Sequence, residues 1–164
     1  MVGREILERL GYSSESWRLD PTIHPFATSI SVDDIRLTTR YSEADAESIF
    51  HTAHEFGHGI YENGIDRALE RTPLVELNSM VLHESQSRLW ENLVCRSRPF
   101  WRFFFPRIQE VFPDQLNGVT DEMYWRYVNR VEPGFIRVEA DEVTYGMHII
   151  LRFELEQEII AGRL

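Results

Sequence analysis

The chain has 164 residues, 43% of them hydrophobic and 12% aromatic, which is enough to fold one domain around a sizeable core and argues against disorder. Its formal net charge of −10 would repel a nucleic-acid backbone, so nucleic acid is not an expected partner. All 17 basic residues are arginine, which excludes lysine nucleophiles, and the single cysteine, Cys95, excludes an internal disulfide and is expected to be a small buried residue.

The first part of the chain predicts a short helix, a turn-rich passage and a strand. Apolar residues in the first ten positions have helical spacing, which Gly11 ends, and the charges among them do not fit a secretory signal. Little regular structure is expected around Asp20-Pro21 and His24-Pro25. Polar and apolar side chains alternate over residues 29–41, which predicts a strand. No run is as long as a membrane span, so we expect a cytoplasmic protein with no membrane partner.

Helices are expected over most of the remaining chain. A helix starting near Ser42 should continue to about Asn63, where Gly64 ends it. A second helix is expected over about residues 74–96, with an apolar stripe at Leu77, Val81, Leu82, Leu89 and Leu93. A turn of helix bounded by Pro99 and Pro106 and a helix over residues 123–131 should follow. A long buried helix is expected within residues 135–164. The fold class that follows is mainly α with one or two short strands.

The motif His54-Glu55-Phe56-Gly57-His58 carries the clearest chemistry in the sequence. Four residues advance an α-helix by about 400°, so His54 and His58 share one face and can reach one metal ion. Glu55 lies beside that face and is a candidate general base for metal-activated water, as in metalloproteases. The alternative is a helix with two surface histidines.

A zinc site with two histidines needs at least one more protein ligand. Glu84 is the candidate, because it follows His58 by enough residues to finish one helix, turn, and return antiparallel beside it. Taken alone, a single glutamate on a helix is more often a solvated surface charge. The motifs around Glu84 favour the metal ligand over the surface charge.

Four motifs in order resemble the signature blocks of the M32 metallocarboxypeptidases, the thermostable carboxypeptidase Taq family. They are Asp34-Ile35-Arg36-Leu37-Thr38, the HEFGH motif, His83-Glu84-Ser85-Gln86 with Ser87-Arg88-Leu89-Trp90-Glu91-Asn92, and residues 136–145, IRVEADEVTY. The resemblance runs from about Leu19 to the last residue. It implies a zincin-type helical metallopeptidase core, a zinc ion with cobalt as an alternative, and removal of C-terminal residues from peptides.

By the same resemblance, His54, His58 and Glu84 match the metal ligands and Glu55 the catalytic glutamate. A bidentate arginine should hold the substrate's terminal carboxylate. Arg137 is the first candidate for it.

Three further residues are candidate substrate contacts. Arg36 is the second candidate for the carboxylate anchor, and an ion pair with Asp34 that braces the strand is its alternative role. His83 is a candidate contact that could instead steady Glu84 or pack between helices. Tyr145 is a candidate oxyanion donor or, more simply, a buried tyrosine.

Chains of this family are much longer, with a helical region before this segment and a further active-site block after it. The sequence is therefore interpreted as a single-domain fragment, residues 1–164, that carries the metal-site core of a metallocarboxypeptidase acting on peptides with a free C-terminus, with a homodimer expected. Two alternatives stay open. One is a catalytically incomplete metal-binding fragment that self-associates or needs the missing segments. The other is a helical zinc oligoendopeptidase.

Overall fold

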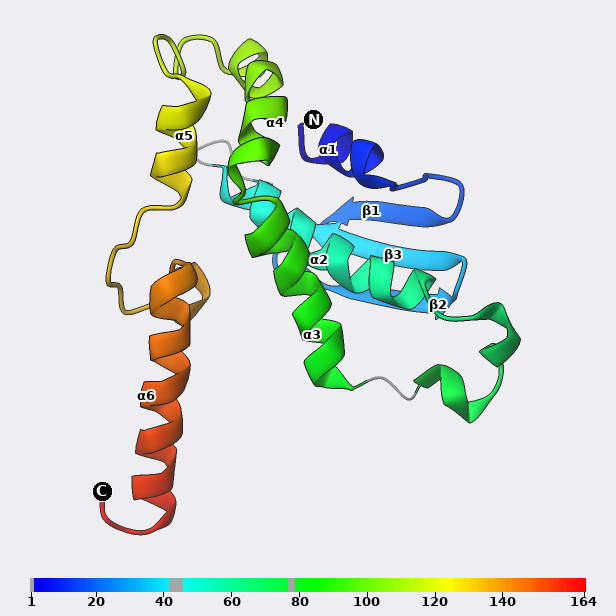
Figure 1. Ribbon diagram of the computed structural model, residues 1–164. Helices are drawn as coiled ribbons and strands as arrows, with labels where there is room; N and C mark the ends of the chain where they lie inside the picture. Colours follow the sequence, from blue (N-terminus) through cyan, green and yellow to red (C-terminus); the bar gives the residue numbers. More distant parts are fainter. Residues whose placement is uncertain (1, 42–45, 77–78) are drawn as a thin grey trace.

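The computed structural model describes residues 2–41, 46–76 and 79–164. These residues form a mainly helical chain with a small sheet, as predicted (Figure 1). The α-helices are α1 (Val2–Leu10), α2 (Glu47–Asn63), α3 (Met80–Arg88), α4 (Arg98–Val111), α5 (Asp121–Val128) and α6 (Glu142–Ile160), and the strands are β1 (Trp17–Pro21), β2 (Ala27–Ser31) and β3 (Asp34–Thr39). Short 3-10 turns cover Arg67–Leu69, Pro73–Glu76 and Arg137–Glu139.

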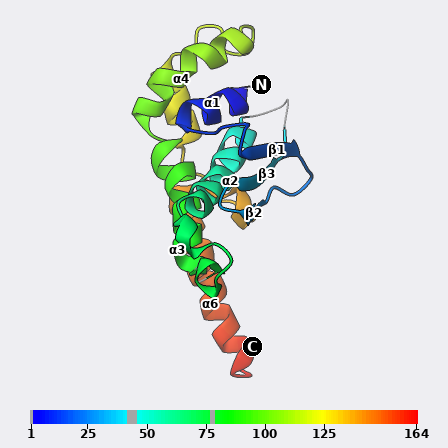
Figure 2. The same cartoon turned by 90° about the vertical axis from the view of Figure 1, so that its right-hand side faces the viewer.

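The sheet has the order β1-β3-β2, with β3 parallel to β1 and antiparallel to β2. The alternation predicted for β3 is confirmed, since Ile35, Leu37 and Thr39 are buried and the intervening residues are not. Ile35 and Leu37 join a core with Trp17 and with Phe56 of α2. Helix α2 therefore lies on the face of the sheet to which these side chains point (Figures 1 and 2).

The sheet differs from its prediction in two places. The single strand expected over residues 29–41 is divided into β2 and β3, and β1 lies in the passage expected to be irregular. Apolar Trp17 packs into the core, and Pro21 is tolerated because it ends an edge strand, where a missing N–H costs no ladder bond. Pro21 thus marks the end of a strand, whereas Pro25 lies in the loop before β2.

A second core joins α1, α2, α4 and α5 around Trp101. Cys95 is fully buried in it, as predicted, and burial raises the pKa of its thiol to about 12. Helix α4 continues through Pro106, which the sequence analysis placed at a helix end. Pro106 lies on the exposed face, and burial of Phe105 and Ile108 on the other face outweighs its cost of about 3 kcal/mol.

The helix predicted over residues 74–96 is broken into pieces. It consists of the 3-10 turn Pro73–Glu76, helix α3, and a π-helical turn, Leu89–Val94. The predicted stripe does not face the core: Val81, Leu82, Leu89 and Leu93 are exposed, and Leu77 lies outside the described residues. The reason is that α3 packs on α2 through Ser87, which is fully buried.

Helix α6 has the predicted position but not the predicted burial. It projects away from the rest of the chain, and none of its residues is buried (Figures 1 and 2). Its apolar side chains are exposed because no described element covers them; Phe153 is 63% exposed. In the part of the chain that is described, no helix has both the length and the apolar character needed to cross a membrane.

Asp141 caps the start of α6, and its replacement by alanine is expected to fray the helix. Its carboxylate accepts hydrogen bonds from the backbone N–H groups of Val143 and Thr144 at 2.9 Å and from that of Glu132 at 2.9 Å. Although partial burial acts in the opposite direction, these bonds lower the pKa of Asp141 from 3.8 to about 2. We expect D141A to cost about 1 kcal/mol of helix stability.

The stability of α6 should depend on pH because the pKa of Asp141 is lowered in the folded chain. Because the pKa is lower in the folded chain, the stabilisation is complete above the unfolded value of 3.8 and is lost as the pH falls through about 2. Far-UV circular dichroism from pH 5 to pH 2 should show this acid loss in the wild type and not in D141A. An equal acid loss in D141A would contradict the capping role.

Candidate metal centre

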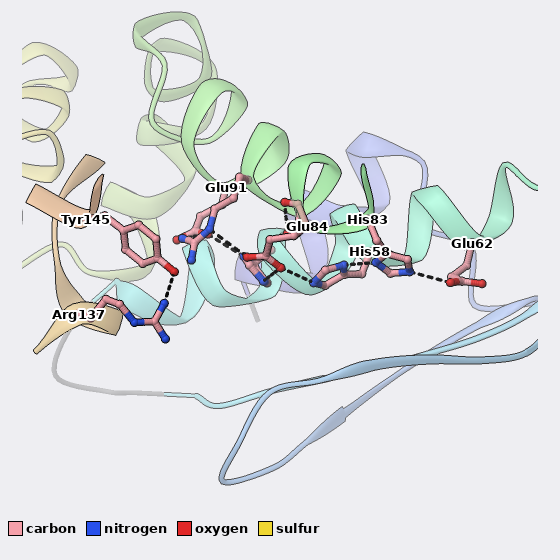
Figure 3. Close-up of polar contacts among 10 residues, drawn as sticks. His58, Glu62, His83, Glu84, Glu91, Arg137 and Tyr145 are labelled. Atoms are coloured by element: carbon pink, nitrogen blue, oxygen red, sulfur yellow. Dashed lines mark hydrogen bonds and ion pairs between the residues drawn. The ribbon is translucent and has the colours of Figure 1, made fainter. Parts of the chain in front are cut away.

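His54 and His58 of α2 come together with Glu84 of α3. Figure 3 shows Glu84 beside His58. One potential ligand atom from each of the three residues lies within 4.8 Å of the others. The Oε2 atom of Glu84 is 3.4 Å from Nε2 of His58 and 3.7 Å from Nε2 of His54. The structure thus brings together the three residues that the sequence analysis selected as metal ligands.

Gly57 sets the close approach of the two helices. A Cβ atom at this position would lie 2.5 Å from the Cα of Ser87 and 2.7 Å from the carbonyl oxygen of Gln86. Both are backbone atoms of α3, so α3 would have to move away. Since Ser87 follows Glu84 by one helical turn, this contact also sets how near Glu84 comes to the histidines.

We expect G57A to weaken metal binding, because α3 and Glu84 must move away from α2. Overpacking of this kind costs about 1–3 kcal/mol of folding free energy. Thermal unfolding and zinc titration of the same sample would measure both effects. The matched control is G146A, since a Cβ atom at Gly146 meets nothing within 4 Å. Wild-type zinc affinity in G57A would contradict this role.

Glu91 orients the ring of His54 through a hydrogen bond at Nδ1. Its Oε2 atom accepts from Nδ1 of His54 at 2.8 Å, which leaves Nε2 of His54 facing Glu84. Burial disfavours the charged imidazole, but the hydrogen bond and charge of Glu91 outweigh it and raise the pKa of His54. The same bond, together with Arg88, outweighs burial and lowers the pKa of Glu91. The π-helical turn brings Glu91 to this position, and such turns are frequent at functional sites.

His58 is held by a hydrogen bond at its Nδ1 atom. Its Nδ1 atom is 2.5 Å from Nδ1 of His83, and Nε2 of His83 is 2.6 Å from Oε1 of Glu62 (Figure 3). Burial, together with the nearby His54 and His83, lowers the pKa of His58 to about 4. His58 is therefore neutral near pH 7 and keeps a lone pair for a metal.

Glu55 directly follows His54 in α2 and is only 7% exposed. Burial raises its pKa to about 7; the charge of His54 opposes the shift, and those of Glu84 and Glu91 add to it. A carboxyl group with this pKa can both accept and release a proton near neutral pH. The sequence placed it beside the ligands, and its environment suits proton transfer.

Arg137 and Tyr145 reach the centre through Arg88. Nη1 of Arg137 donates to the hydroxyl of Tyr145 at 2.5 Å, and the guanidinium of Arg88 lies 4.1 Å from the centre of the Tyr145 ring. Arg88 in turn donates to Glu84 at 3.2 Å and to Glu91 at 2.9 Å. Two predicted substrate contacts are thus joined to the candidate ligands by one chain of polar and cation–π contacts.

Arg36 lies away from the three candidate metal ligands. Its guanidinium makes two 2.8 Å hydrogen bonds with Asp34, on the sheet face opposite Ile35 and Leu37, which pack toward α2. The structure therefore does not bring Arg36 together with the three ligands, and the Asp34 pair matches the bracing alternative.

The roles of Glu62, Arg88 and Glu91 were not predicted from the sequence. Glu62 follows His58 by four residues, and Glu91 follows Glu84 by seven, so each lies on the helical face of a predicted ligand. That spacing was the available signal. What it could not show is which nitrogen of which histidine each carboxylate would contact.

The donor set fits a zinc ion. Two neutral imidazole nitrogens and one carboxylate are the protein ligands typical of catalytic zinc sites, which keep a fourth position open. Each histidine uses Nδ1 for a protein partner and turns Nε2 toward Glu84. Supporting partners of this kind orient metal-bound histidines in general.

Comparison with known proteins identifies the family. The sequence profile of the Carboxypeptidase Taq (M32) metallopeptidase family matches residues 1–164. The chain belongs to the M32 metallopeptidase family. The resemblance seen in the four sequence motifs is thereby confirmed.

Among M32 relatives, the thermostable carboxypeptidase 1 of Thermus thermophilus is 51% identical over 161 residues, which cover 98% of this chain and 31% of that protein. Carboxypeptidase 1 of Bacillus subtilis is 46% identical over 159 residues, which cover 96% of this chain and 32% of that protein. The crystal structure of the M32 carboxypeptidase from Deinococcus radiodurans R1 matches with a TM-score of 0.93 and 48% identity, over 99% of this chain and 33% of that one. The chain spans about a third of the length of these M32 proteins.

Proposed function

We propose that this chain carries the metal centre of a zinc-dependent carboxypeptidase that releases single residues from the C-termini of peptides. The observation that supports this proposal most is the convergence of His54, His58 and Glu84 with a buried Glu55 beside them. Cobalt has similar ligand preferences and is the alternative ion. A cytoplasmic location and a homodimer stay predictions.

In the proposed mechanism, Glu55 is the proton carrier. When bound, a zinc ion polarises the scissile carbonyl and makes water more acidic. Glu55 accepts the proton of the attacking water and passes it to the leaving amine, and its pKa of about 7 suits both steps. Glu91 and Arg88 hold His54 and Glu84 in place meanwhile.

Arg137 is the proposed anchor for the terminal carboxylate of the substrate. Its guanidinium can pair with a carboxylate in a bidentate manner, and it is connected to the centre through Tyr145. Tyr145 is the proposed hydrogen-bond donor to the developing oxyanion. Arg36 and His83 stay predicted substrate contacts, and the ion pair of Arg36 with Asp34 favours its bracing role.

The test of this function is cleavage of peptides that differ only at their C-terminus. The zinc-loaded chain should release the last residue from a blocked dipeptide with a free carboxylate and lose activity on its amidated form. The variant R137Q stays polar but loses the positive charge and the guanidinium group, so it should raise KM for the free-carboxylate peptide. Equal cleavage of both peptides would favour an oligoendopeptidase.

A catalytically incomplete metal-binding segment is the second candidate. Large apolar side chains are exposed along α6, and the chain spans about a third of its relatives, so groups from elsewhere in the family fold could be needed for cleavage. Zinc bound at one equivalent with no Glu55-dependent release of residues would favour this candidate over the enzyme.

A further inference from the structure

Two consecutive residues of α3 contact the two ring nitrogens of His58. Glu84 lies 3.4 Å from Nε2 and His83 lies 2.5 Å from Nδ1. A contact between two imidazole nitrogens at hydrogen-bond distance requires a hydrogen on one and a lone pair on the other. The direction of this bond decides which nitrogen of His58 is free to bind a metal.

Glu62 sets that direction. An ionised carboxylate only accepts hydrogen bonds, so Nε2 of His83 donates to Oε1 of Glu62 over their 2.6 Å contact. A neutral His83 then has its lone pair on Nδ1 and accepts the hydrogen from Nδ1 of His58. This leaves the lone pair of His58 on Nε2, which faces Glu84 (Figure 3).

The three side chains are fixed and shielded from water. Ser29 of β2 donates to Oε2 of Glu62 at 3.0 Å, and the ring of Tyr61 lies 4.8 Å from that of His83. Glu62, His83 and His58 are 18%, 19% and 16% exposed. Hydrogen bonds among such groups are stronger than in water, and a lost partner is not easily replaced by solvent.

We propose that Glu62 and His83 are positioning residues that select the tautomer of His58 and so prepare its Nε2 atom to bind the metal. This inference rests on the proposed metal centre and adds two residues to it. His54 is supported directly by the carboxylate of Glu91, whereas a second imidazole stands between His58 and its carboxylate. With both its nitrogens engaged, His83 fits this role better than a substrate contact.

Zinc affinity of His83 variants tests the proposal. H83F keeps a ring of similar size but removes both nitrogens, so it separates hydrogen bonding from packing. We expect zinc binding, measured by competition with a chelator, to weaken about 10–100-fold, as is typical when a ligand loses its supporting partner. H83N restores an acceptor near the Nδ1 position and should recover part of that affinity. H24F makes the same change at an exposed loop residue and should bind zinc like the wild type.

The tautomers give a second readout. In ¹⁵N NMR spectra of the chain with and without zinc, His83 should carry its hydrogen on Nε2 and His58 on Nδ1. Zinc affinity of H83F within twofold of the wild type, or a hydrogen on Nδ1 of His83, would refute the positioning role of Glu62 and His83 while leaving the proposed metal centre intact. A wild-type chain that binds no zinc would instead refute the proposed function itself.

Discussion

Replacing Glu55 with glutamine is expected to lower kcat for C-terminal residue release by about 10²–10⁴-fold while zinc remains bound. Glutamine has nearly the same shape but cannot accept the proton of the attacking water. His54, His58 and Glu84 are unchanged in this variant, so the metal ligands stay in place. Release of the terminal amino acid from a blocked dipeptide, with zinc content measured on the same sample, gives both quantities.

The control for this experiment is E15Q, the same change at an exposed glutamate before β1. It should leave zinc content and kcat unchanged. The pH dependence of kcat/KM adds an independent check: because the pKa of Glu55 is raised to about 7 by burial, the wild-type rate should fall as acid protonates it. Zinc binding removes some of this shift, so the midpoint should lie below 7 in the loaded chain. Residual activity in E55Q with the wild-type pH profile would assign the proton transfer to another group.

The helix that carries HEFGH was predictable because its signals are local. The spacing of His54 and His58 and the stop at Gly64 depend only on the period of an α-helix, and α2 ends at Asn63 as expected. The prediction of Glu84 as a ligand depended on the assumption that two helices pack against each other. The feature that makes this packing close is Gly57, inside the motif itself, since only a residue without a side chain lets α3 come so near.

The support around the ligands was not predictable from the same patterns. The π-helical turn shifts the position of Glu91 relative to an uninterrupted helix. The predicted apolar stripe fails even before this turn, at Val81 and Leu82, because α3 packs on α2 through Ser87. Hydrogen bonds such as that between His58 and His83 depend on side-chain orientation, which sequence spacing does not define. The prediction that α6 is buried was wrong for a different reason. Periodicity shows which face of a helix is apolar, but it does not show what covers that face.

The second large effect is expected from Glu84. E84Q keeps the length of the side chain but replaces a charged ligand by a neutral amide, and we expect zinc affinity to fall by more than about 100-fold, beyond the usual effect of losing a supporting partner. The neighbouring variant S85A removes an exposed hydroxyl one residue away and should bind zinc normally.

E84Q also weakens the contact with Arg88, because it removes the charge of the acceptor, so the two consequences must be separated. Arg88 keeps its 2.9 Å bond to Glu91, and the contact of Glu91 with His54 does not involve Glu84. Thermal stability of metal-free E84Q should therefore stay close to that of the metal-free wild type, whereas the stabilisation gained on adding zinc should disappear. Equal zinc stabilisation in E84Q and wild type would mean that the two histidines bind the metal with a different third group, and the Oε2 position between their Nε2 atoms would then need another explanation.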